Sequence, residues 1–359
     1  MAFRIWALAL LLLSACSAPS AASQPHAASQ PHAVILLYHH VSEDTPASTS
    51  VTPAQFERHL DYLADNDYRV WPLQRVLDAV LKGSETVPEQ VVALTFDDAY
   101  ESVYTAARPR LAARGWPYAV FANTDAIDAG HSPYMSWDQL RALAEQGAAI
   151  GNHSAGHGHM ARPRPDESER EWRRRVRDDI EKARSRIAEE IGRAPGLFAY
   201  PYGEDSPELG KVVAEEHEYG LAQRSGPLGP LIDPFSIPRF PMATGFASME
   251  RLELAVRSRP LPVSGTETRA TQPADTDAID RIELEVEPGG FRAGQLNCFA
   301  GSGRRLEAET DGDGPYRVTI DVEGVGGSGR NKINCTAPAA DGSGDFYWFS
   351  WQWLVAGPG

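Results

Sequence analysis

Short apolar runs alternate with longer amphipathic stretches from residue 34 to about residue 260, and this alternation restricts the possible folds. Parallel strands need long crossover connections, usually helices, so strands separated by helices are typical of a mostly parallel sheet. The sequence therefore predicts one α/β domain over residues 34–260. Its expected buried strands are Val34–Tyr38, Val91–Phe96, Tyr118–Ala122, Ala148–Gly151 and Gly196–Tyr200.

Two of the connecting helices are clear in the sequence. Residues 166–192 carry an apolar residue every three or four positions beneath a charged outer face, which is the pattern of an amphipathic helix. A second helix is expected to begin after Ser136, a typical N-cap residue, and to end near Gly147.

The C-terminal part of the chain has a different periodicity. Residues 261–278 are rich in Pro, Thr, Ser and acidic residues, so we expect a linker there. Beyond them apolar and polar residues alternate, as in antiparallel strands with one buried face. This predicts a small antiparallel β-domain over residues 279–359. Its aromatic segment 346–355 leaves two roles open, an accessory module for carbohydrate binding or docking and a purely structural domain.

The N-terminus has the features of an export signal. Arg4 precedes an apolar run over residues 5–13 that is too short to span a bilayer. The Leu-Ser-Ala-Cys at 13–16 resembles the lipobox of bacterial lipoproteins, which implies removal of residues 1–15 and acylation of Cys16. Residues 16–33 would then be the lipid anchor and a flexible tether, and the expected location is the outer membrane, facing the periplasm. The alternative is an ordinary secretory signal with a chance cysteine.

Export and charge constrain the disulfide and the partners. An oxidising compartment favours a disulfide between the two remaining cysteines, Cys298 and Cys335, with two free buried thiols as the alternative. The chain has 34 basic and 49 acidic residues, a formal net charge of −15. Because this charge would repel a phosphate backbone, nucleic acid is excluded as a partner.

Acidic and imidazole side chains follow two of the predicted strands. Asp97 and Asp98 come directly after one strand, at the end where α/β domains place their active sites. If the chain turns helical after His153, the i,i+4 spacing points the imidazoles of His153 and His157 to one side. A cation would offset the repulsion between neighbouring carboxylates. These residues predict a divalent metal site, with His159 as a rival ligand or a residue of its rim.

The segments Thr-Phe-Asp-Asp at 95–98 and His-Ser-Ala-Gly-His at 153–157 together resemble two motifs of the polysaccharide deacetylase family. These carbohydrate esterases share the NodB homology domain, and the resemblance implies an irregular (β/α) barrel. It also implies that Asp97 is the catalytic base. Asp98, His153 and His157 would hold a divalent ion, usually Zn²⁺.

The segment Phe-Ala-Tyr-Pro-Tyr-Gly at 198–203 resembles the third motif of the family, F-R-x-P-Y-G. The resemblance implies that Pro201 and Tyr202 contact substrate, and that the Tyr202 N–H helps to stabilise the oxyanion. The Arg of that motif, which orients the base, is replaced by Ala199. Arg239 is the candidate substitute, and the alternative is that Arg239 lies on the surface.

The family takes its general acid from a Leu-x-His motif near the end of the domain, and residues 230–260 contain none. Leu-Tyr-His at 37–39 provides one at the start, which resembles the circularly permuted branch that includes poly-N-acetylglucosamine deacetylases. His39 is then the expected acid. His40 is the competitor, because adjacent strand residues point to opposite faces. Trp137 either lines the cleft and stacks on sugar or packs in the core.

The resemblance implies a metal-dependent deacetylase that acts on an N-acetylated polysaccharide of the envelope or extracellular space. Metal-activated water would attack the acetyl group, and acetyl ester removal is a close variant. The missing Arg motivates an alternative, a catalytically degenerate lipoprotein that binds glycan during polysaccharide export or assembly.

Overall fold

The computed structural model describes residues 30–269 and 279–355 of the 359-residue chain. The predicted signal peptide, Cys16 and most of the predicted tether lie outside the described residues. Within the described part, no helix is both long enough and apolar enough to cross a membrane.

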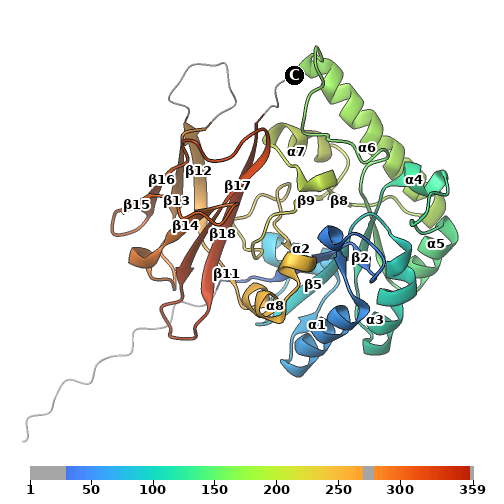
Figure 1. Cartoon of the computed structure of the whole chain (residues 1–359), viewed down its shortest axis with the longest axis horizontal. Coiled ribbons are helices and arrows are strands. Elements are labelled where there is room, and N and C mark those ends of the chain that lie inside the picture. The colour runs from blue at the N-terminus through green and yellow to red at the C-terminus, as the bar shows by residue number, and fades with distance from the viewer. Residues whose placement is uncertain (1–29, 270–278, 356–359) are drawn as a thin grey trace, which may run out of the picture.

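The first domain is built on a parallel sheet in the order β10-β1-β5-β6-β7-β8-β9, with β4 beside the start of β5. Figure 1 shows this sheet curled, with helices around its outside. The chain's first strand therefore lies between β5 and β10, as expected for a leading strand in a barrel. The strands are β1 (Val34–Tyr38), β4 (Arg69–Val70), β5 (Val91–Phe96), β6 (Ala119–Ala122), β7 (Ala149–Asn152), β8 (Leu197–Ala199), β9 (Tyr219–Leu221) and β10 (Phe240–Pro241).

Eight α-helices of the described chain connect or follow these strands. The two that the sequence predicts lie close to their predicted bounds. Capping boxes at Ser136 and Ser168 fix the starts of two predicted helices, because each serine accepts from the N3 backbone and the N3 side chain accepts in return. The helices are α1 (Pro53–Asp65), α2 (Leu73–Lys82), α3 (Arg108–Arg114), α4 (Thr124–Asp128), α5 (Trp137–Glu145), α6 (Glu169–Ile191), α7 (Pro207–Val213) and α8 (Met249–Val256). The short strands β2 (His40–Val41) and β3 (Ser50–Val51) pair beside the barrel.

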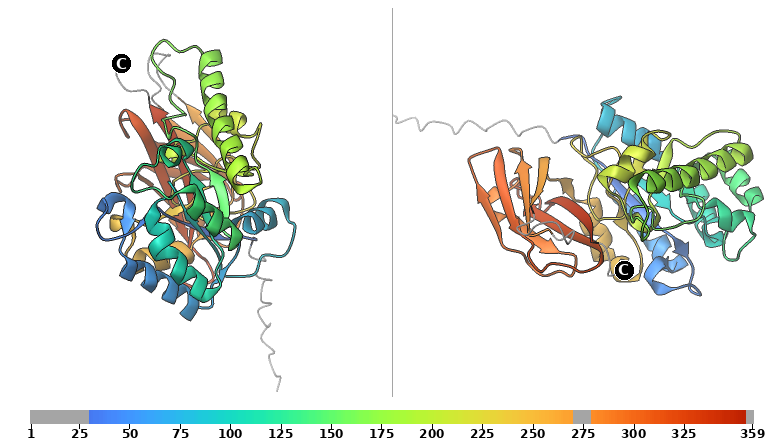
Figure 2. Two further views of the ribbon diagram at one scale, coloured as in Figure 1. Left: turned by 90° about the vertical axis from the view of Figure 1, so that its right-hand side faces the viewer. Right: turned by 90° about the horizontal axis from the view of Figure 1, so that it is seen from above.

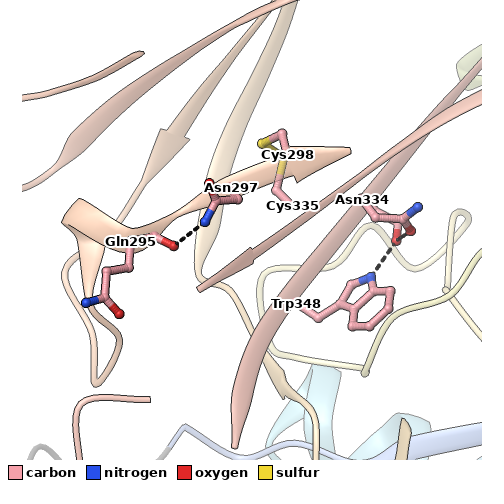
Figure 3. Close-up of a disulfide and its surroundings, with 7 residues drawn as sticks. Gln295, Asn297, Cys298, Asn334, Cys335 and Trp348 are labelled. Atoms are coloured by element: carbon pink, nitrogen blue, oxygen red, sulfur yellow. Dashed lines mark hydrogen bonds between the residues drawn. A yellow bond between two sulfur atoms is a disulfide. The ribbon is translucent and has the colours of Figure 1, made fainter. Parts of the chain in front are cut away.

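The second domain consists of two four-stranded sheets around their own apolar core (Figure 2). All pairings within them are antiparallel except that of β11 with β18. Cys298 on β14 and Cys335 on β17 are cross-strand partners joined by a disulfide (Figure 3). The strands are β11 (Arg259–Pro260), β12 (Val263–Arg269), β13 (Arg281–Val286), β14 (Asn297–Ala300), β15 (Ala308–Asp311), β16 (Tyr316–Asp321), β17 (Gly329–Pro338) and β18 (Phe346–Val355).

Part of the predicted linker is wrong. Val263–Arg269 forms β12, which pairs with β13 over its whole length. As an edge strand it buries only Val263 fully, so its polar composition is that of a loop. Residues 270–278 lie outside the described residues.

Strand β18 is covered on both faces. Trp353 lies in the core of the β-domain, and Tyr347, Phe349 and Trp351 pack against that core. On the other face, Trp348 is 8% exposed and belongs to the core of the first domain, where its ring meets Phe240 edge to face. The aromatic face that could have been a platform for sugar is therefore an interdomain contact.

Candidate active site

The carboxyl ends of β1, β5 and β7 bring the predicted site residues together. The backbone N–H of Asp97 donates to Tyr38 O, so Asp97 follows β5 beside the residue that follows β1, His39. The next residue, Asp98, has a φ of 69°, which turns the chain sharply at the end of the strand. His153 follows β7 directly. The side chains thus meet at one mouth of the barrel.

Asp98, His153 and His157 form a cluster of candidate metal ligands, which we call the metal cluster. Their three ligand atoms all lie within 4.8 Å of one another. The Nε2 atoms of His153 and His157 are 3.4 and 3.0 Å from Asp98 Oδ1. The loop after His153 is not helical, so the i,i+4 spacing does not explain how the two imidazoles meet. Ser154 and His157 have φ values of 66° and 50°, and Ser154 Oγ accepts from the His157 N–H, so a tight turn places the second imidazole.

The cluster fits a divalent cation. Asp98 Oδ1 is buried and has no partner in hydrogen-bonding geometry within the described chain. His153 Nδ1 lies 2.7 Å from Ala199 O, an acceptor, so Nδ1 carries the proton and Nε2 presents a lone pair toward Asp98. Burial alone would raise the pKa of Asp98, but the two imidazoles hold it well below its usual range. One carboxylate and two imidazoles are ligands suited to zinc and similar ions.

Asp97 is held by Arg239, the residue considered as the substitute for the motif arginine. Arg239 is fully buried, and its Nη1 and Nη2 donate to the two carboxylate oxygens of Asp97, both at 2.8 Å. Its Nε donates to Ala222 O. Burial would raise the pKa of Asp97, but the guanidinium and His153 lower it. The carboxylate therefore stays ionised beside the metal cluster.

The two histidines after β1 have different surroundings. Burial lowers the pKa of His39, while the charges of Asp97 and Asp98 act to raise it. The ring of His40 instead stacks on Tyr100, with 3.5 Å between the centroids. Burial and the neighbouring His39 lower the pKa of His40 to about 4.

The third motif forms a turn at the rim of the site. Pro201–Gly203 is a short 3-10 segment in which Pro201 is buried and Tyr202 has the left-handed values φ 59° and ψ 4°. The Tyr202 ring is 43% exposed and lies 4.7 Å from the ring of His157. His159 stacks on it at 4.1 Å, so this histidine belongs to the rim.

Trp137 is not brought to this site. Its indole donates to Asp128, and Arg186 lies 5.1 Å over its ring, so Trp137 packs between helices α4 and α6. Asn123, which the sequence reasoning missed, does reach the mouth. It follows β6 as Asp97 follows β5, stands beside His153 in the strand register, and buries an Oδ1 that has no partner in the described chain.

Comparison with known proteins agrees with this geometry. A family model described as polysaccharide deacetylase matches residues 84–222, which include Asp97, the metal cluster and the Tyr202 turn. The chain contains a polysaccharide deacetylase domain. It is 27% identical over 196 residues to YxkH of Bacillus subtilis. It is 24% identical over 237 residues to the poly-β-1,6-N-acetyl-D-glucosamine N-deacetylase of Escherichia coli K12.

These matches cover only part of each protein. Each includes 54% of this chain, and the chain spans 64% of the Bacillus protein and 35% of the Escherichia coli enzyme. Among solved structures, IcaB from Ammonifex degensii is 23% identical with a TM-score of 0.56, covering 64% of this chain and 98% of its own. The BpsB deacetylase domain from Bordetella bronchiseptica is 26% identical with a TM-score of 0.51, covering 58% and 95%. The predicted NodB-type barrel is confirmed.

Proposed function

We propose that this protein is a metal-dependent deacetylase that removes acetyl groups from an N-acetylated polysaccharide, with poly-N-acetylglucosamine as its substrate class. The observation that carries the proposal is the metal cluster beside an ionised carboxylate, Asp97, that Arg239 holds in place. The substrate class follows the name of the Escherichia coli relative.

The chain's own residues divide the work of amide hydrolysis. A divalent ion held by Asp98, His153 and His157, which we propose to be Zn²⁺, would supply Lewis acidity to the attacking water and the acetyl carbonyl. Asp97 is ionised and fixed by two hydrogen bonds, so it can take the proton of the water.

Two further groups act on the substrate. The Tyr202 N–H would donate to the oxyanion that forms on the acetyl carbon. His39 follows β1, which pairs with β5 on the side away from β6 and β7, and it would protonate the departing amine. The alternative of a degenerate glycan-binding lipoprotein is weakened, because the feature behind it was Ala199, and Arg239 now supplies a cation to Asp97.

The test is acetate release by the full chain from a panel of poly-N-acetylglucosamine oligomers, chitin oligomers, peptidoglycan and acetylated xylan. We expect release from the first, loss of release with a chelator, and recovery when Zn²⁺ is returned. Asp98→Ala should lose both metal and activity, whereas His131→Ala, which changes an exposed histidine, should lose neither. Metal-loaded protein that releases no acetate from any of these polymers would support the binding role instead.

We also propose that the mature chain is an outer-membrane lipoprotein acylated at Cys16 and facing the periplasm. The Leu-Ser-Ala-Cys segment after the apolar run supports this. In cell fractionation, the wild type should sediment with membranes. Cys16→Ser, which cannot be acylated at this position, should not. Equal soluble fractions of the two proteins would contradict the anchor.

A further inference from the structure

The turn that carries Tyr202 has a backbone conformation that a tyrosine does not favour. Tyr202 and Gly203 are both left-handed, with φ values of 59° and 66°. Left-handed φ is uncommon for a residue with a Cβ and persists where the surroundings impose it. At Gly203 any Cβ would lie 2.1 Å from the side chain of Gln223, so the turn is also packed tightly. Some neighbouring structure must therefore hold it.

That neighbouring structure is the β-domain. Arg330 on β17 donates from Nη1 to the carbonyl oxygens of Tyr202 and Gln223. Gln352 on β18 donates from Nε2 to Gly203 O at 2.8 Å. Two successive carbonyls of the turn are thus bonded to side chains that are 128 and 149 residues away in sequence.

A second set of hydrogen bonds, around Asp205, holds the same contact between the turn and the β-domain. The carboxylate of Asp205, which is 7% exposed, accepts from Gln352 and from Arg224. Arg224 is itself buried and donates from Nε to Ser350 O, on the face of β18 that meets the first domain. Buried charged groups that are fully paired in this way hold their surroundings in one arrangement.

The Tyr202 side chain of this turn contacts the metal cluster. The Tyr202 ring lies between His159, stacked at 4.1 Å, and the ligand His157 at 4.7 Å. The backbone of the turn is therefore anchored in the β-domain, while its side chain meets a metal ligand. A shift of β17 or β18 would move the Tyr202 N–H relative to the site.

We propose that the β-domain is a structural part of the active site, and that Arg330 and Gln352 are positioning residues that hold the Tyr202 turn in its catalytic conformation. This inference rests on the proposed deacetylase function. Of the two roles that the sequence left open for this domain, it is the structural one.

The test compares Arg330→Met with Arg330→Lys in the full chain, and uses Arg317→Met, at an exposed position of β16, as the matched control. On a soluble N-acetylglucosamine oligomer, Arg330→Met should lower kcat about 10- to 100-fold with an unchanged KM and full metal content, because misplacement near 1 Å costs about that much. Arg330→Lys should recover most of the loss, since its ammonium can still donate to Tyr202 O. Gln352→Leu should lower kcat similarly.

A second measurement does not depend on activity. Amide hydrogen exchange in residues 200–205 should speed up in Arg330→Met and stay unchanged in Arg317→Met. If the wild type releases no acetate, the proposed function fails, but faster exchange would still show the anchoring. Wild-type kcat and exchange in both Arg330→Met and Gln352→Leu would overturn the inference.

Discussion

Replacing Arg239 by methionine should destabilise the chain strongly, because it leaves a buried carboxylate without its cation. Arg239 and Asp97 are 0% and 1% exposed, so solvent does not screen the pair. Two hydrogen bonds at 2.8 Å join them, and hydrogen bonds to charged groups are each worth about 1.5–3 kcal/mol. Breaking one partner of a buried ion pair costs about 3–5 kcal/mol, and we expect Arg239→Met to fall in that range.

A double-mutant cycle separates the pair from the general effect of each change. Asp97→Asn alone leaves a buried guanidinium, whereas the double variant Asp97→Asn/Arg239→Met removes both charges. We expect the double variant to be more stable than the sum of the single changes predicts, by about 2 kcal/mol or more, within the range seen for contacting residues.

The assay is urea unfolding of the metal-loaded full chain, with the free energy of unfolding compared among the four proteins. Metal content, measured in parallel, should be the same in Arg239→Met and wild type, because Arg239 is not a ligand. A loss below about 1 kcal/mol in Arg239→Met, together with additive single changes, would refute the buried ion pair. Acetate release should fall in Arg239→Met even at low urea, where it remains folded.

Three further predictions concern single features. His39→Ala should keep its metal but lose about 10²- to 10⁴-fold in acetate release, the usual size of an acid–base contribution, and His40→Ala should lose far less; the reverse order would exchange their roles. Burial lowers the pKa of His217 to about 4, so its contribution to stability, on the order of 3 kcal/mol, is present above pH 6.5 and lost as the pH falls toward 4. His217→Leu should therefore flatten the dependence of the urea midpoint on pH between 7 and 5, and an unchanged slope would contradict this. Removing the disulfide in Cys298→Ser/Cys335→Ser should cost up to about 4 kcal/mol by loop entropy, and an unchanged urea midpoint would show that the strands already supply that constraint.

The sequence predicts the barrel because its central strands are long, apolar runs. Val34–Tyr38 and Val91–Phe96 match the structure to the residue. The peripheral strands β4, β9 and β10 have two or three residues each, too few to produce a periodic pattern. The edge strand β12 has the composition of a linker because it turns mostly polar side chains to solvent.

The metal cluster was predictable because its residues follow buried strands, at the end of the sheet where α/β domains place their active sites. The same rule also fits Asn123, which it would have found if applied to β6. Arg330 and Gln352 could not be found in this way. Each is a polar residue in an alternating strand, and its partner in the other domain is set by tertiary packing alone.

Strand β18 belongs to two cores at once, and this affects how the molecule comes apart. Unfolding the first domain would expose the face of β18 that carries Trp348, and unfolding the β-domain would uncover the part of the first domain's core around Phe240 that Trp348 packs against. The two domains therefore share part of their unfolding free energy, and we expect one cooperative melting transition rather than two. For the same reason this β-domain is not an exchangeable module: grafted onto another protein, it would carry an uncovered tryptophan face with it.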